Sequence, residues 1–289
     1  MKKLIVYFFL LLIVSCNPTG QKSGEKIITV SIPPFKYFIN EIGGRDFSVN
    51  IMVPPVANPH IYEPVPDQIA NLRKSVAYVS DGYLGFEMTW LDRFYETNPQ
   101  MKRLSLGTNI DLIKPEGHHD EEHSEGADPH YWVSPKCAFI IASEIKTLLT
   151  GINPEKSDIY NHNYNILVKS IDSLDRRAKE LYASYQKSPF MIFHPTLGYL
   201  ARDYGLEQVA VEKEGKEPNP SSLKELIDFG KSKKIKIIFV QREYDIKNAR
   251  AIAAETGAVI ETIDPLSENW EGSVRDIINA LYRSFKAAE

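Results

Sequence analysis

The chain has 289 residues, of which 43% are hydrophobic and 25% are charged, so it is long and apolar enough for two moderate domains, each with its own core. Its formal net charge of −4 gives no positive surplus, which argues against nucleic acid as a partner.

The first residues have the pattern of a secretion signal. Lys2 and Lys3 precede an apolar run over 4–14, which is too short to cross a bilayer of roughly 30 Å as a helix. A small residue and then Cys16 follow this run, as at the cleavage site of a bacterial lipoprotein. We therefore expect residues 1–16 to be a lipoprotein signal peptide that ends at Cys16, with the lipid attached to that cysteine. The alternative is an ordinary cleaved signal peptide with an incidental cysteine.

Residues 17–26 (NPTGQKSGEK) have the composition of a flexible tether. Such a tether would hold the folded body to a membrane outside the cytoplasm, on the periplasmic side in a Gram-negative cell. Cys137 is the other of the two cysteines, so lipidation of Cys16 leaves no disulfide within the chain. Any metal site must therefore rest mainly on nitrogen and oxygen ligands.

Short apolar segments then alternate with amphipathic ones, which is typical of an α/β unit with a largely parallel sheet. We expect residues 27–152 to form an N-terminal α/β lobe. Its predicted strands are 27–32, 47–53, 76–80 and 103–107, and its predicted helices are 35–43, 66–74, 87–97 and 135–150.

The pattern changes at Pro154, because from there to Gln186 the chain has neither glycine nor a further proline. A sustained helical periodicity predicts a rigid linking helix within 153–187, of roughly 45 Å at 1.5 Å per residue. The α/β alternation resumes in a C-terminal lobe, 188–289. Its predicted strands are 189–194, 206–211, 235–240 and 258–263, and its predicted helices are 197–204, 220–233, 246–256 and 271–285. The predicted fold is two (β/α) lobes with parallel-rich sheets, joined by one long helix.

Four histidines lie outside the acidic tract described below, and His162 among them belongs to the linking helix. His60, His130, His194 and Asp264 lie instead in loops or at strand ends, where open α/β sheets place their ligands. Each alone is more often a structural or surface group. Together, two from each lobe predict a four-ligand metal site in the cleft between the lobes.

The donor set favours Zn²⁺ over Mn²⁺, because three imidazoles and one carboxylate suit zinc, whereas manganese prefers more oxygen ligands. Each ligand histidine is expected to donate its second ring N–H to an acceptor. Glu63, three residues after His60, and Asp128, two before His130, are the candidates.

Residues 116–128 (EGHHDEEHSEGAD) hold three histidines among six carboxylates. Such a tract either collects metal ions weakly or is a solvated linker. Because it leads directly to His130, we favour an auxiliary metal-collecting loop that uses His118, His119 and His123.

Six motifs in chain order resemble the zinc and manganese solute-binding proteins of bacterial ABC importers, in particular the zinc-uptake type. They are PHIYEP (59–64), DPHYWVSP (128–135), HPTLGYLARDYGL (194–206), EPNPSSLKEL (217–226), IIFVQREYDIKNARAIAAETGA (237–258) and IDPL (263–266). The resemblance covers essentially the whole mature chain. It implies two lobes on a rigid helix and a metal between them. It also implies that His60, His130 and His194 are ligands, and that Asp264 occupies the fourth, carboxylate position.

From this resemblance we expect a monomeric, extracytoplasmic zinc carrier, not an enzyme, that delivers Zn²⁺ to an ABC permease. A manganese carrier of the same family is the first alternative. A secreted zinc hydrolase is the second, although the chain lacks a His-Glu-x-x-His motif. A lipoprotein with an added role in cell adhesion is a third.

Overall fold

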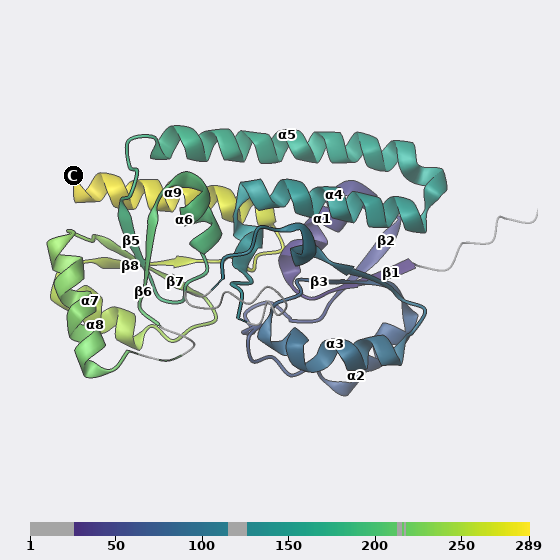
Figure 1. The fold of residues 1–289 in the computed structure, drawn as a ribbon, viewed down its shortest axis with the longest axis horizontal. Helices are drawn as coiled ribbons and strands as arrows, with labels where there is room; N and C mark the ends of the chain where they lie inside the picture. Colours follow the sequence, from purple (N-terminus) through teal and green to yellow (C-terminus); the bar gives the residue numbers. More distant parts are fainter. Residues whose placement is uncertain (1–25, 115–125, 213–215, 217) are drawn as a thin grey trace, which may run out of the picture.

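Two four-stranded parallel sheets, one in each half of the chain, form the frame of the fold (Figure 1). The computed structural model describes residues 26–114, 126–212, 216 and 218–289. The strand orders are β2-β1-β3-β4 and β6-β5-β7-β8, so both sheets have the same topology. The strands are β1 (Lys26–Val30), β2 (Phe47–Ile51), β3 (Ser75–Ser80), β4 (Lys102–Ser105), β5 (Pro189–Ile192), β6 (Glu207–Ala210), β7 (Ile237–Gln241) and β8 (Val259–Ile263). All eight predicted strands are confirmed to within a few residues.

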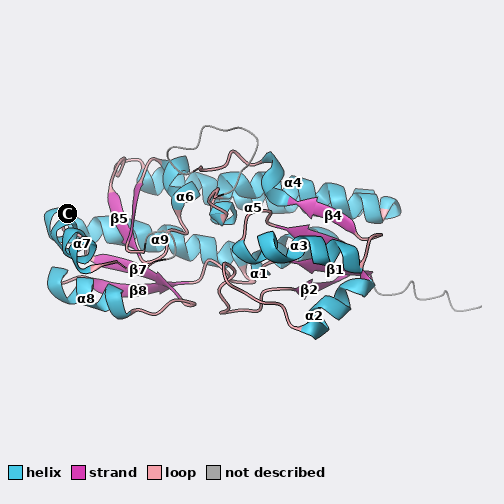
Figure 2. Cartoon of the chain, turned by 60° about the horizontal axis from the view of Figure 1, so that its bottom comes forward, coloured by secondary structure: helices cyan, strands magenta, loops and turns pink. Residues whose placement is uncertain are grey.

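The helices begin and end where local chemistry favours it. Proline occupies the first turn of several of them, Ser134 and Asn219 cap two N-termini with their side chains, and Gly257 ends one helix at a φ of 71°. The helices around the sheets are α1 (Pro33–Gly43), α2 (Pro66–Asn71), α3 (Gly85–Thr97), α4 (Pro135–Ile152), α6 (Gly198–Tyr204), α7 (Pro220–Ser232), α8 (Lys247–Thr256) and α9 (Trp270–Ala288). Figure 2 shows these helices in cyan, and each matches a predicted helix.

The linking helix is α5 (Ser157–Tyr182), preceded by a short 3-10 turn, Pro154–Lys156. Its 26 residues span about 39 Å, and it runs along both lobes, packing on α1 and α4 and then on α9 (Figure 1). It is shorter than the expected segment because Ala183 and the residues after it turn toward β5. His162 is exposed on this helix. Among the described residues, no helix combines the length and the apolar character that a membrane span requires.

The lobes do not have fully separate cores, contrary to the expectation from chain length. One cluster of buried hydrophobic residues extends from the N-terminal sheet through the interface into α9, and a smaller cluster lies between the C-terminal sheet and the helices α7 and α8. Trp132 connects the halves, because its indole Nε1 donates to the carbonyl of Pro265 at 2.9 Å and its own carbonyl accepts from Trp270 Nε1 at 2.7 Å. These two bonds join the lobes at their interface.

Candidate metal centre

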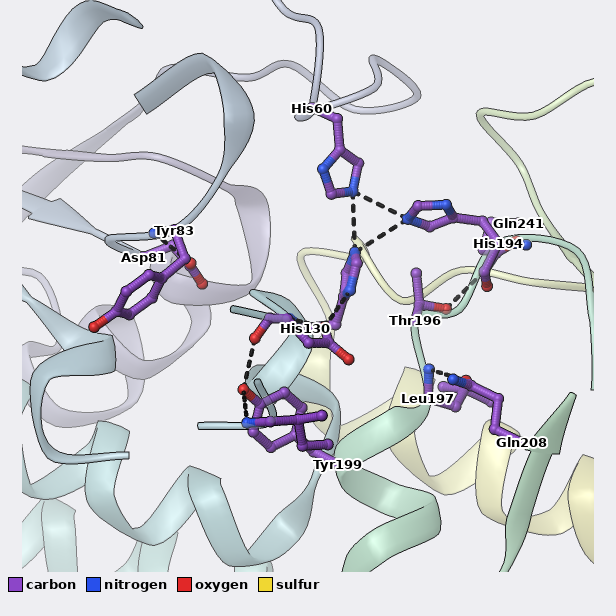
Figure 3. Close-up of polar contacts among 12 residues, drawn as sticks. His60, Asp81, Tyr83, His130, His194, Thr196, Leu197, Tyr199, Gln208 and Gln241 are labelled. Carbon is purple, nitrogen blue, oxygen red and sulfur yellow. Dashed lines mark hydrogen bonds and ion pairs between the residues drawn. The ribbon is translucent and has the colours of Figure 1, made fainter. Parts of the chain in front are cut away.

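Three histidine rings from distant parts of the chain meet between the lobes (Figure 3). The Nε2 atom of His60 lies 3.1 Å from that of His130 and 3.0 Å from that of His194, and the last two are 3.3 Å apart. His130 and His194 are buried and His60 is half-buried. The structure thus brings together the three histidines that the sequence singled out.

The spacing of these atoms fits a tetrahedral metal ion. With metal–nitrogen bonds of about 2.0 to 2.1 Å, two nitrogens at neighbouring corners of a tetrahedron are roughly 3.3 Å apart. The three measured separations, 3.0 to 3.3 Å, are close to this value. Without a cation, the nitrogen lone pairs would face one another at close range.

Two of the three histidines each end a turn of the same type, formed by an Asx-Pro-His sequence. The Asn58 side chain accepts from the backbone N–H of His60 at 2.8 Å, and Asp128 accepts from the backbone N–H of His130 at 2.9 Å. Such side-chain-to-backbone bonds stabilise turns. Gly85 is also required here, since a Cβ at this position would meet the backbone carbonyl of His60. Local hydrogen bonds therefore form both turns, and Gly85 leaves room for the turn of His60.

His194 is held from the C-terminal sheet. It lies just beyond β5, where Gln241 at the end of β7 donates to its carbonyl at 2.6 Å and to the hydroxyl of Thr196 at 2.6 Å. The ring of Tyr244 stacks on the His194 imidazole, with ring centroids 4.7 Å apart and planes at 17°. The orientation of the ring is thus fixed by both backbone and aromatic contacts.

Carboxylates contact the second nitrogen of two of the rings. Asp128 Oδ1 is 2.6 Å from His130 Nδ1, and Glu212 Oε2 is 3.3 Å from His194 Nδ1. These acceptors favour the tautomer with the proton on Nδ1, which leaves Nε2 free to bind a metal. Glu63 is exposed, and within the described part of the chain no carboxylate pairs with His60.

Sequence reasoning missed Glu212, although the signal was present. Glu212 follows β6, the neighbour of β5, and its backbone N–H donates to the carbonyl of Phe193 at 2.9 Å. His194 follows β5, and Glu212 is a polar residue just after the neighbouring strand β6. This position is the feature that would have identified Glu212.

Burial keeps His60 and His194 neutral by lowering the pKa of both rings. It lowers the pKa of His60 to about 2, with further lowering by the neighbouring rings of His130 and His194. Burial also lowers the pKa of His194, against the opposing effect of its bond to Glu212. Neutral imidazole is the form that binds a metal.

Asp264 is not part of this cluster. The three histidines have ligand atoms within 4.8 Å of one another, and Asp264 does not join that group. Its Oδ2 lies instead 3.2 Å from Arg242 Nη1. The cause is strand register. Gln241 pairs with Ile263 in the neighbouring parallel strands β7 and β8, so the residues that follow them, Arg242 and Asp264, lie side by side. The expected set of four ligands is therefore not what the structure assembles.

A cavity of about 670 Å³ leads to the cluster from the surface, and His60, His130 and His194 are among the residues that line it. Lys114 and Gly126, which flank residues 115–125, line it as well. His118, His119 and His123 lie outside the described residues, as do the predicted signal peptide, Cys16 and residues 17–25 of the tether.

Comparison with known proteins agrees with this geometry. The model of the family described as "Zinc-uptake complex component A periplasmic" matches residues 28–284. The chain is 26% identical to the zinc-binding lipoprotein AdcA of Streptococcus pneumoniae over 96% of its own length, but it spans only 58% of the length of that lipoprotein. It is 27% identical to the high-affinity zinc uptake system protein ZnuA of Bacillus subtilis, with 96% and 92% of the two chains covered.

The fold is also that of a solved structure. A crystal structure of ZnuA superposes with a TM-score of 0.83 at 35% identity, over 90% of this chain and 99% of the other. The family match extends over most of the chain, and this superposition agrees with it. The chain belongs to the zinc-uptake complex component A family.

Proposed function

We propose that this protein captures Zn²⁺ outside the cytoplasm with His60, His130 and His194 and delivers it to an ABC importer. The observation that carries the proposal is the convergence of three Nε2 atoms at 3.0 to 3.3 Å between the lobes. In this proposal the ion is cargo, and the protein binds and releases it without a chemical reaction. The similarity of this chain to a zinc-binding lipoprotein and to a zinc uptake system protein supports the proposal.

Zinc is favoured over manganese by the donors. Three buried or half-buried imidazoles supply nitrogen, and zinc is well served by a nitrogen-rich tetrahedral site. Manganese sites usually contain more oxygen. The ligand atoms that the described residues bring within 4.8 Å of one another are all imidazole nitrogens, which agrees with zinc.

The partner in this proposal is the permease of the importer, and the protein is a monomer tethered to the membrane by a lipid on Cys16. The cavity beside His60 is the side from which the ion would leave. We also propose that the acidic tract 116–128, with its three histidines, collects metal ions for this site. Its last residues, Gly126, Ala127 and Asp128, line the cavity, so in this proposal the tract collects ions at the entrance.

Release is expected without a large hinge motion. Tyr37 Oη donates to Glu271 at 2.9 Å, and Tyr199 Oη in the C-terminal lobe donates to the carbonyl of Asp128 at 2.6 Å. Together with the Trp132 bonds, these contacts resist separation of the lobes. Small-angle scattering with and without zinc should therefore show a change in radius of gyration well below the several Å expected for an opening hinge.

Zinc binding by the mature chain, stripped of metal by a chelator, tests the proposal. Competition against a chromophoric chelator should show about one tightly bound equivalent of Zn²⁺, held more tightly than Mn²⁺. His60→Gln, His130→Gln and His194→Gln should each weaken binding by at least tenfold. His162→Gln, on the exposed face of α5, is the matched control. Failure of the unmodified chain to bind zinc more tightly than micromolar would refute the proposal.

A further inference from the structure

A small cavity lies directly at the histidine cluster, where the fourth ligand of a tetrahedral metal ion would bind. Its volume is about 10 Å³, near the lower limit for one water molecule or ion. All three histidines border it, and the one carboxylate-bearing residue on its lining is Glu243. Asp264 does not line it, although its neighbours Pro265 and Leu266 do.

We propose that Glu243, and not Asp264, supplies the carboxylate that completes the coordination of the bound ion. The inference rests on the proposed function, since it concerns the same site. The family resemblance placed the fourth ligand at Asp264; the proposed ligand is instead Glu243, two positions beyond the buried end of β7.

The local structure places Glu243 against the cluster. The backbone N–H of Tyr244 donates to the carbonyl of Gln241 at 3.3 Å, which makes a tight turn at the end of β7. Gln241 and Tyr244 both contact His194 or its backbone, as described above. Glu243 lies between these two anchors and is half-buried. The segment that carries it is thus fixed relative to the ligands.

The carboxylates of Asp264 and Glu243 differ in whether a positively charged side chain pairs with them. The Arg242 guanidinium is 3.2 Å from Asp264, so that carboxylate already has a cation beside it. Glu243 forms no ion pair within the described ranges, although it faces the His130 ring and the negative charge of Asp264. A carboxylate that is partly removed from water without a cation is unfavourable. A divalent ion at the cluster would relieve that cost for Glu243, whereas Asp264 would first have to leave Arg242.

Binding of the ion by Glu243 requires a rotation of its side chain. The carboxylate of Glu243 is not within the 4.8 Å group of ligand atoms, so binding requires a change in its side-chain torsions. Glutamate has three such torsions, and rotation between staggered positions is an ordinary event at a partly exposed site. The fourth ligand would then move in when the ion arrives.

Three variants test the proposal: Glu243→Gln, which keeps the size of the side chain and removes its charge, Asp264→Asn, and Glu261→Gln as the control. Glu261 is a carboxylate of the same sheet that pairs with Arg283. Zinc affinity is measured by chelator competition, and the visible absorption of the Co²⁺-loaded proteins reports the ligand set. Circular dichroism of the metal-free proteins confirms that each is folded.

We expect Glu243→Gln to lose about tenfold or more in zinc affinity and to change the Co²⁺ spectrum, while the other two variants match the unmodified chain. Glu243→Asp, which keeps the charge, should retain more affinity than Glu243→Gln. The proposal is overturned if Glu243→Gln leaves affinity and spectrum unchanged, or if Asp264→Asn alone alters them; in both cases the zinc-carrier function stands. Absence of zinc binding by the unmodified chain would overturn that function as well.

Discussion

Asp128 contacts His130 twice, because its Oδ1 accepts from the backbone N–H at 2.9 Å and lies 2.6 Å from the ring Nδ1. One carboxylate therefore fixes both the turn on which the ligand lies and the orientation of its ring. This double contact makes Asp128 the residue outside the ligand set whose loss should matter most.

Asp128→Ala should weaken zinc binding on the order of 10- to 100-fold, since a lost outer partner of a ligand histidine has an effect of that size. Chelator competition measures it. Glu63→Ala removes an exposed carboxylate that pairs with none of the three rings, and it should bind zinc like the unmodified chain. Equal affinity of the two variants would contradict the role assigned to Asp128.

Gly85→Ala should also weaken zinc binding, by about tenfold, through a displacement of His60. The added Cβ would meet the backbone carbonyl of His60, so the loop has to move. Gly151→Ala is the matched control, because a Cβ there meets nothing within 4 Å and the position is near the end of α4. That variant should leave affinity unchanged and raise the melting temperature slightly. A Gly85→Ala protein with full affinity would show that the loop adapts without moving the ring.

The metal-free protein should lose stability as the pH falls below about 6.5. Burial lowers the pKa of His60 to about 2 and also lowers that of His194, whereas both rings titrate near 6.5 in the unfolded chain. Below pH 6.5 the unfolded state therefore binds more protons than the folded state, and the free energy of unfolding decreases. Above this pH the two histidines do not change the free energy of unfolding with pH.

Urea unfolding in the presence of a chelator, at pH 7.5 and 5.5, measures this effect. Carboxylates add their own pH dependence, so the readout is the difference between the unmodified chain and His60→Gln, which should be less sensitive to pH. His162→Gln should behave like the unmodified chain. Identical pH profiles for His60→Gln and the unmodified chain would rule out the contribution from burial of His60.

Trp132→Phe should lower the free energy of unfolding by about 1 to 3 kcal/mol, because the buried carbonyl of Pro265 loses its donor. Trp90→Phe, at a half-buried position of α3, is the control and should cost less. Both proteins should unfold in a single transition, since one hydrophobic cluster spans the two lobes. Separate transitions for the two lobes, followed by tryptophan fluorescence and circular dichroism, would contradict a shared core.

The order of strands and helices could be predicted from the sequence because each element has its own local pattern. Helix N-terminal prolines, the break at Pro154 and the glycine after α8 all act within a few residues. The positions of His60 and His130 were predictable for the same reason, because each Asx-Pro-His turn is a local structure.

The carboxylates around the site were harder to predict, because strand register decides their partners. Asp264 looked like a ligand from its place at a strand end, but the pairing of Gln241 with Ile263 puts it beside Arg242. Glu212 was overlooked although the pairing of β5 with β6 brings it to His194. Such relationships join residues separated by about twenty positions, and no single segment contains them.

The 3-10 turn His130–Val133 carries a candidate ligand at one end and Trp132 near the other. The rings of His130 and Trp132 have centroids 5.3 Å apart, and the indole is almost completely excluded from solvent. Indole emission responds to the charge and protonation of an imidazole at such a distance. We therefore expect the fluorescence of Trp132 to change when a metal ion enters or leaves the site, without a label, in a variant in which Trp90 is replaced by phenylalanine. Trp270 is kept, because its Nε1 donates to the carbonyl of Trp132.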